Sequence, residues 1–366
     1  MNKKILFYFG HPAQYLFARN TIKQLIQKSY EIKIIIKTKD VLETLLKNDG
    51  MEYENILTKE RGGSKISIIF SLLKRNLLLL PIILKFKPDL LIGTDATIAQ
   101  LGKLLNINRI TILEDDYKII KSLANITYPF TQTIFCPTVC DAGKWDSKKI
   151  GYSGYMKLGY LHPNIFKVNK EIINKYKLPD KYAIIRLAKL TAHHDFGIKG
   201  IDYEVLEQII NILESKRIKV FLSTEGNIDS KYKQYLLNIN PNDIHHILAK
   251  SQILICDSQS MSVEASILGV PSIRVSSFAG KISVLEELEH KYNLTFGINP
   301  QNINQLFIQL KKLLSIENLQ EEFINRRNLM LEDKIDVSKL FTWFIEQYPK
   351  SIEIIKIDSK FQNKFK

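Results

Sequence analysis

The chain has 366 residues, of which 45% are hydrophobic and 25% charged, so it is too long for one ordinary domain and is neither disordered nor fibrous. Its three cysteines are too few for a disulfide framework. The formal net charge of +14 favours an anionic partner. We do not expect nucleic acid to be that partner, because the sequence shows no basic recognition helix, zinc finger or base-stacking platform.

Apolar runs alternate with amphipathic stretches along the first half of the chain. Short and almost continuously apolar runs predict buried strands at 4–9, 31–36, 90–92, 111–113 and 133–135. Apolar residues at helical spacing predict helices at 15–28, 41–47 and 96–105. This alternation is typical of a parallel sheet that is covered by helices on both faces.

The N-terminal apolar run stops at Gly10, and no small-residue cleavage site follows it. We therefore interpret this run as the first strand of the sheet and not as a signal peptide. Together with the low cysteine content, this interpretation predicts a chain that stays in a reducing cytoplasm.

The most apolar region, residues 66–92, is interrupted by Lys74, Arg75 and Pro81, and its uncharged runs are too short for a membrane-spanning helix. One interpretation is a helix buried against the sheet, which Pro81 kinks or ends. The other is a segment that lies on an anionic membrane surface, at the inner face of the cell membrane. The two interpretations are compatible if one face of the helix packs on the sheet and the other touches lipid.

The strand–helix pattern starts again after a charged helix and turn at 167–179. Strands are predicted at 182–187, 220–223, 253–256 and 272–275, and helices at 205–215, 244–249, 263–268, 303–314 and 319–331. We therefore predict two α/β domains, residues 1–165 and 166–345, and a basic C-terminal tail, residues 346–366, that is open to fraying.

The most informative segment is DSQSMSVEA, which begins at Asp257 directly after the predicted strand 253–256. Small polar residues at a helix start leave backbone N–H groups free, and the helix dipole favours an anion there. A diphosphate suits Ser258 to Ser262, and Glu264, one turn into the helix, could accept hydrogen bonds from ribose hydroxyls. The alternative is a helix with an Asp/Ser N-cap and a surface glutamate.

The pattern D-S-x-S-x-x-x-E-A-x-x-L-G-x-P, from Asp257 to Pro271, resembles the nucleotide-sugar motif of the GT-B superfamily, which includes glycosyltransferases and UDP-N-acetylglucosamine 2-epimerases. The segments GYMKLGYLHPNIF, RLAKLTAHHDFGIKGI and FLSTEG are similar to segments of a bacterial and archaeal family of unknown function in that superfamily. The resemblance implies a GT-B-like α/β fold, with two Rossmann-type, doubly wound domains that face a central cleft.

It also implies which domain does what: the first receives the acceptor and the second binds the nucleotide sugar. In the superfamily the small residues of the motif hold the diphosphate and its glutamate holds the ribose. The residues of this segment that we expect to bind the donor are Asp257, Ser258, Ser260, Met261, Ser262 and Glu264.

A second candidate site follows the predicted strand 182–187. Arg186 and Lys189 could neutralise a diphosphate leaving group. His193 and His194 could donate to phosphate, or one of them could act as an acid or base, with Asp195 orienting it. The alternative is a loop with surface histidines. A zinc site is not expected, because no third ligand has motif spacing.

A third candidate segment, Ser223 to Gly226, follows the strand 220–223. The resemblance places it near the nucleotide base, so Glu225 and Gly226 are predicted to contact the donor. An N-cap followed by a turn explains the same residues without a ligand.

The first half contributes polar residues after three predicted strands. Gly10 lets the backbone approach a ligand, and His11 could face the cleft, so both are predicted to contact the donor. Asp95, Glu114 and Asp115 are candidate bases for an acceptor hydroxyl. A solvated acidic N-cap is the alternative for residues 114–116.

An epimerase requires paired acid/base groups, and the resemblance would place them at Asp95 and near Glu114. The sequence departs from that pattern, because it has no Glu-Ala-Gly run there, no further downstream glutamate and no arginine in the first loop. We therefore expect a metal-independent glycosyltransferase, without a cofactor, that moves a sugar from a nucleotide sugar to a glycan or lipid-linked acceptor. The alternatives are a nucleotide-sugar 2-epimerase and a non-catalytic nucleotide-sugar binder.

Overall fold

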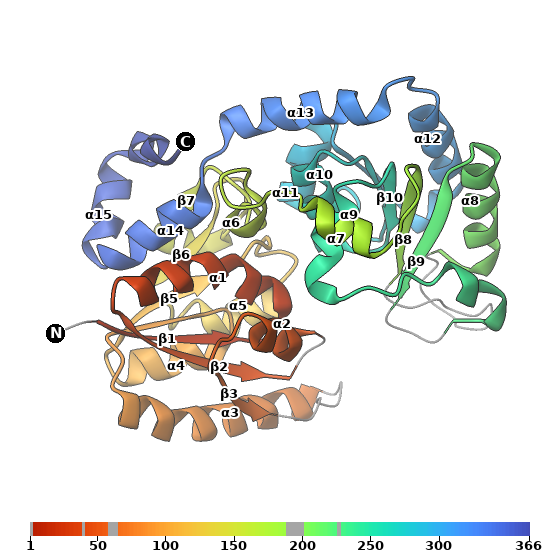
Figure 1. Cartoon of the computed structure of the whole chain (residues 1–366). Coiled ribbons are helices and arrows are strands. Elements are labelled where there is room, and N and C mark those ends of the chain that lie inside the picture. Colours follow the sequence, from red (N-terminus) through yellow and green to blue (C-terminus); the bar gives the residue numbers. More distant parts are fainter. Residues whose placement is uncertain (1–2, 39–40, 58–64, 188–200, 225–227) are drawn as a thin grey trace. The chain divides into compact units, whose positions relative to one another are not determined.

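The computed structural model describes residues 3–38, 41–57, 65–187, 201–224 and 228–366. The chain forms two compact units: residues 1–162 together with 334–366, and residues 163–333. Each unit is built around one parallel sheet flanked by helices (Figure 1). The predicted α/β class with parallel sheets is thus confirmed.

The first unit contains a seven-stranded sheet in the order β3-β2-β1-β4-β5-β6-β7, and all its strand pairs are parallel. Its strands are β1 (Lys4–Phe9), β2 (Glu31–Lys37), β3 (Glu54–Leu57), β4 (Leu90–Gly93), β5 (Asn108–Ile112), β6 (Thr133–Pro137) and β7 (Lys149–Tyr152). The sequence analysis did not predict β3 and β7.

The helices of the first unit lie in two layers. Those between the strands are α1 (Pro12–Gln27), α2 (Leu42–Asn48), α3 (Lys65–Phe86), α4 (Ala96–Leu104), α5 (Lys121–Thr127) and the 3₁₀ helix η1 (Gly143–Lys148). Those that follow the sheet are α6 (Leu158–Leu161), α14 (Val337–Glu346), α15 (Lys350–Ile357) and η6 (Ser359–Phe365). Figure 1 shows α3 and α4 on one side of the sheet, with α1 and α14 on the other.

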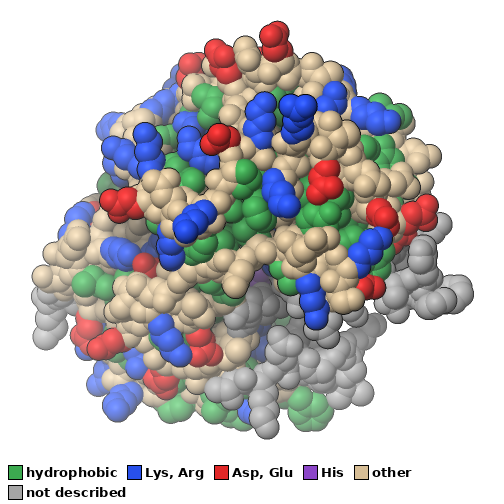
Figure 2. Space-filling model, turned by 45° about the vertical axis from the view of Figure 1, so that its right-hand side comes forward, with side chains coloured by type: hydrophobic (Ala, Val, Ile, Leu, Met, Phe, Trp, Pro, Cys, Tyr) green, Lys and Arg blue, Asp and Glu red, His purple; other side chains and the backbone are tan. Residues whose placement is uncertain are grey.

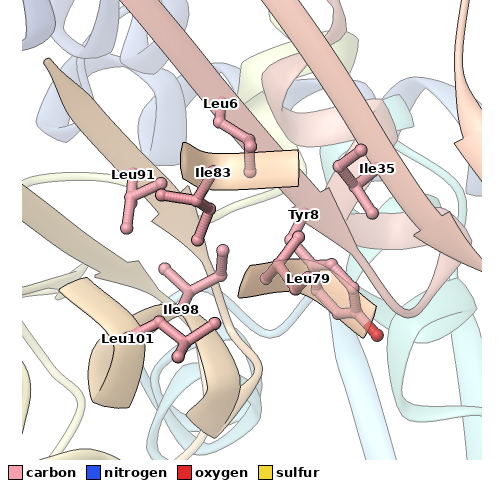
Figure 3. Close-up of a cluster of buried hydrophobic side chains, with 8 residues drawn as sticks. All are labelled: Leu6, Tyr8, Ile35, Leu79, Ile83, Leu91, Ile98 and Leu101. Atoms are coloured by element: carbon pink, nitrogen blue, oxygen red, sulfur yellow. The ribbon is translucent and has the colours of Figure 1, made fainter. Parts of the chain in front are cut away.

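A cluster of buried side chains fixes α3 and α4 against the sheet. Leu79 and Ile83, one turn apart on α3, point toward Leu6 and Leu91 on neighbouring strands (Figure 3). All four are at most 1% exposed, and burying such a side chain contributes about 1.5–3 kcal/mol. The predicted burial of one face of this segment is therefore confirmed. The helix continues through Pro81, which is exposed, so the carbonyl that loses its partner lies on the open side of the helix.

The C-terminal segment differs from its prediction. Residues 334–366 belong to the first unit, whereas we had assigned 334–345 to the second domain and 346–366 to a tail open to fraying. Trp343 packs on Phe361 and Phe365, with ring centroids 4.6 and 5.8 Å apart, and the Asp336 amide donates to the Phe365 carbonyl at 2.7 Å. The basic composition of this segment suggested a frayed tail, but these aromatic contacts and this hydrogen bond hold it against α14.

The second unit contains a five-stranded parallel sheet in the order β12-β11-β10-β8-β9. Its strands are β8 (Tyr182–Leu187), β9 (Lys219–Thr224), β10 (Ile253–Cys256), β11 (Ser272–Val275) and β12 (Thr295–Ile298). Its α-helices are α7 (Lys170–Lys175), α8 (Tyr203–Ser215), α9 (Ile244–Leu248), α10 (Gln259–Leu268), α11 (Ser283–Glu286), α12 (Asn304–Leu314) and α13 (Leu319–Asp333). Its other helical turns are η2 (Ser230–Tyr235), η3 (Pro241–Asp243), η4 (Glu287–Lys291) and η5 (Pro300–Asn302). The sequence analysis missed β12.

All three cysteines are buried as free thiols, and burial raises the pKa of Cys136 and of Cys256 to about 12 and that of Cys140 well above its usual value. Because the thiolate is the reactive form, we expect native protein at pH 8 to react with Ellman's reagent only slowly, and unfolded protein to show all three thiols at once. Rapid reaction of one thiol in native protein would contradict this burial.

No helix within the described ranges is both long and apolar enough to cross a membrane. Figure 2 shows basic side chains distributed over the visible surface and not gathered in one patch. On this face, therefore, the positive charge does not mark a particular binding surface.

Candidate functional site

The order of strands marks one position in each sheet where ligands bind in open α/β folds. Connections leave the sheet in opposite directions between β1 and β4 in the first unit, and between β8 and β10 in the second. Ligands in such sheets bind at the carboxyl ends of the strands beside this switch point. A predicted site residue lies at or just beyond the carboxyl end of each of these four strands: Gly10 at β1, Asp95 at β4, Arg186 at β8 and Asp257 at β10.

The chain turns from β10 into α10 as the sequence predicted. The helix begins at Gln259, four residues earlier than the predicted helix 263–268. Ser258 is its N-cap, and the serine Oγ accepts a hydrogen bond from the Met261 amide at 3.3 Å. The amides of Gln259 and Ser260 have no acceptor within the helix, as in every helix start. Two donors and the positive end of the dipole are therefore available to an anion.

Two arginines lie on the strands on either side of β10, at the level of Cys256. The strand register pairs Cys256 with Arg186 on β8 and with Arg274 on β11. Directly registered residues of neighbouring parallel strands point to the same face of a sheet. The Arg186 guanidinium donates to the Ser223 Oγ at 3.2 Å.

Arg274 is fully buried, and among the described residues none accepts a hydrogen bond from its three guanidinium nitrogens. A Cβ at Gly297 would lie 2.6 Å from Arg274 Nη2, so only glycine leaves space for this side chain. Burial lowers the pKa of Arg274, and the nearby Glu289 acts in the opposite direction. The sequence analysis did not single out Arg274, because an arginine within a short strand has no motif spacing to mark it.

Ser262 does not face the helix start. It is fully buried, and its hydroxyl lies 2.9 Å from the Ser272 Oγ and 2.8 Å from the Thr295 Oγ1. These three hydroxyls satisfy one another in the core, between α10 and strands β11 and β12. The Ser262 side chain therefore anchors the helix in the core, and the predicted contact of Ser262 with the donor stays a prediction.

Glu264 lies one turn into α10 and is 7% exposed, so it is not the surface glutamate of the alternative interpretation. Its Oε1 is 3.3 Å from Nε2 of His245, which comes from α9. Phe166 packs edge-on against His245 and stacks on His246. A buried carboxylate needs such polar partners. The sequence analysis overlooked His245, and the adjacent histidines after η3 were the only signal for it.

In the first unit, Glu114 forms a buried ion pair with Lys157 and also accepts a hydrogen bond from the Met156 amide. Both charged side chains are at most 10% exposed. The segment at 156–157 reaches the carboxyl end of β5 directly after β7. Glu114 is thus held by protein groups, which favours a structural role over the predicted role as a base.

Asp115 is exposed, while its neighbour Asp116 is buried and accepts a hydrogen bond from the Asp141 amide at 2.7 Å. Desolvation by the surrounding protein raises the pKa of Asp115, and the charge of Lys157 opposes this rise. A carboxyl group with a raised pKa at the end of a strand suits general acid–base chemistry. Asp115 is the exposed acid of residues 114–116, and its predicted catalytic role stays a prediction.

Asp95 is the N-cap of α4. Its Oδ1 accepts hydrogen bonds from the Thr97 amide at 3.0 Å and the Thr97 hydroxyl at 2.9 Å, and it lies 3.3 Å from the buried Arg75 Nε. Capping and ion pairing account for its burial. Its predicted catalytic role stays a prediction.

His11 is likewise an N-cap, of α1, and its Nδ1 accepts a hydrogen bond from the Ala13 amide at 3.2 Å. A Cβ at Gly10 would lie 2.7 Å from Cε of Lys37. The glycine therefore admits the Lys37 side chain to the end of β1. Contact of Gly10 and His11 with a donor stays a prediction.

Five predicted site residues lie outside the described residues: Lys189, His193, His194, Glu225 and Gly226. Asp195, the proposed orienting group, also lies there. Among the described residues no group of three or more His, Cys, Asp or Glu side chains could hold a metal ion. Metal independence stays a prediction.

Two parallel α/β units, each with its switch point and with the C-terminal helices returning to the first unit, define the GT-B fold. Solved structures agree over nearly the whole chain. A UDP complex of S. aureus MnaA has a TM-score of 0.69 at 16% identity and covers 95% of this chain and 97% of that chain.

Two further structures share the fold. The UDP-GlcNAc 2-epimerase of Methanocaldococcus jannaschii has a TM-score of 0.62 at 15% identity, over 90% of this chain and 99% of that one. The spinosyn forosaminyltransferase SpnP has a TM-score of 0.58 at 13% identity, over 93% and 98%. No protein-family model and no curated protein matches the sequence. The chain therefore has the GT-B fold.

Proposed function

We propose that the chain is an enzyme that binds a nucleoside diphosphate sugar at the start of α10. One observation carries the proposal: the amides of Gln259 and Ser260 lack acceptors within the helix at the start of α10, which follows β10 at the switch point of the second sheet, and Arg186 of the neighbouring strand β8 is in register with Cys256 at the end of β10. A diphosphate matches the donors and the positive charge. Glu264, one turn along the helix, is the group proposed to hold the ribose hydroxyls.

Structures of the same fold support a uridine nucleotide as the first ligand to test. One is titled as a complex with UDP, and an epimerase structure from Neisseria meningitidis is titled as bound to UDP-GlcNAc. The shared fold and the free amides at the start of α10 both support binding of a nucleotide by this chain.

We propose glycosyl transfer as the reaction. Asp95 and Glu114 are engaged in a helix cap and a buried ion pair, which leaves Asp115 as the exposed carboxyl group of the predicted set. A transferase needs one base to take a proton from the acceptor hydroxyl, together with positive groups that stabilise the departing diphosphate. Asp115 is the proposed base, and the acceptor is a glycan or lipid-linked glycan.

Epimerisation at C2 is the second candidate. Several of the similar structures are titled UDP-N-acetylglucosamine 2-epimerase, including those from Listeria monocytogenes and Methanocaldococcus jannaschii. This reaction requires acid/base groups on the sugar itself, so it would have to recruit Asp95 or Glu114 away from the contacts described above.

Nuclear magnetic resonance of UDP-N-acetylglucosamine in deuterated buffer separates the two reactions. If the chain is a transferase, we expect no deuterium at C2 without an acceptor, and release of UDP that depends on added acceptor and falls at least about tenfold in Asp115→Asn. Deuterium at C2 without an acceptor would instead establish the epimerase.

Calorimetric titration with UDP, GDP and CMP tests the underlying binding. If none of the three nucleotides binds, the nucleotide-sugar proposal is refuted.

A further inference from the structure

Helix α3 packs one face on the sheet and leaves an apolar stripe on the other. Four large side chains along this outer face are more than half exposed: Leu77 at 72%, Phe70 at 67%, Leu84 at 54% and Leu73 at 53%. Their spacing of three, four and seven residues places them on one side of the helix. Single exposed leucines are normal on protein surfaces, but a continuous stripe indicates an interaction surface.

Basic side chains border this stripe. Lys74 and Lys85 are exposed on the same side of α3, and Lys87 is exposed just after the helix ends. None of the three forms an ion pair with another residue that the structure describes, whereas the inward-facing Arg75 is paired with Asp95. The outer cations are therefore available to an external anion.

The described side chains of α3 itself carry no negative charge. From residue 70 to the end of α3 there is no acid, and the next acid along the chain, Asp89, accepts a hydrogen bond from the Lys4 amide at 2.8 Å. An apolar stripe with cations along its border and without acids matches a bilayer that carries anionic headgroups, where leucines enter the interface and lysines meet phosphates.

We propose that the outer face of α3 docks the protein on an anionic membrane surface, with the helix lying in the interfacial plane. On the face shown in Figure 2, basic side chains are distributed and not clustered, so no lysine cluster there competes with α3 as a docking site. The proposal is independent of the reaction: it concerns the first unit alone and stands if the chain proves to be an epimerase.

Co-sedimentation with phosphatidylcholine vesicles, with and without phosphatidylglycerol, tests the proposal. We expect native protein to bind only the anionic vesicles, and Leu73→Glu/Leu77→Glu to reduce the partition coefficient at least about tenfold. The matched control is Ile308→Glu/Leu329→Glu, which changes two leucine-like residues of similar exposure, 58% and 60%, in the second unit and should bind as native protein does. Circular dichroism verifies that each variant is folded.

A charge reversal separates the contribution of the apolar stripe from that of the bordering lysines. In Lys74→Glu/Lys85→Glu the apolar stripe remains, so binding should lose its preference for anionic lipid and its sensitivity to salt. Equal binding of native protein and Leu73→Glu/Leu77→Glu would overturn the proposal, as would failure of native protein to bind anionic vesicles. A dimer that the leucine variant dissociates, without vesicle binding, would assign the stripe to a second copy of the chain instead.

Discussion

Replacing Glu264 with alanine should weaken nucleotide binding roughly 10- to 100-fold, because hydrogen bonds to a charged group contribute about 1.5–3 kcal/mol. The carboxylate is 7% exposed and already oriented by His245, so little ordering would be needed when ribose hydroxyls arrive. Calorimetric titration with UDP, GDP and CMP measures the change. Glu264→Gln should retain part of the affinity, since its amide oxygen still accepts a hydrogen bond.

Glu317→Ala is the control, because it removes an exposed carboxylate from the same unit and should leave the affinity unchanged. The loss of Glu264 also removes a partner from His245, so the thermal unfolding of each variant is recorded without nucleotide. If Glu264→Ala binds every nucleotide as tightly as native protein does, Glu264 is not part of the site.

Replacing Lys157 with methionine should lower the free energy of unfolding by about 3–5 kcal/mol, which is the usual cost of leaving one partner of a buried ion pair uncompensated. The Glu114 carboxylate would keep its hydrogen bond from the Met156 amide but lose the neighbouring charge. Urea unfolding followed by tryptophan fluorescence measures the change, because both tryptophans, Trp145 and Trp343, lie in the first unit with this pair.

Lys33→Met is the matched control, since the Lys33–Glu54 pair lies in the same unit with side chains that are 37% and 44% exposed. An exposed pair contributes at most about 1 kcal/mol. The double change Lys157→Met/Glu114→Gln should recover part of the loss, because no buried charge remains. Equal destabilisation by Lys157→Met and Lys33→Met would show that the Glu114–Lys157 pair is not an important source of stability.

The predictable parts of this protein rest on local chemistry. Strand–helix alternation predicted the two parallel sheets, and the DSQSMS segment predicted the start of α10, since capping serines and apolar periodicity act over a few residues. The short strands β3, β7 and β12 were missed because they are only partly buried and mix polar residues or glycine with apolar ones, whereas the equally short β4, β10 and β11 are buried throughout.

The sequence by itself determined the α/β class, the division into two parts and the helix start that carries the proposed site. Only the tertiary structure decided which polar groups meet, namely Lys157 with Glu114 and His245 with Glu264. It also decided that Arg274 on β11 is in register with Cys256 on β10. It also returned the C-terminal helices to the first unit. These contacts join residues far apart in the chain, so they depend on strand order and on packing between elements, which no local pattern encodes.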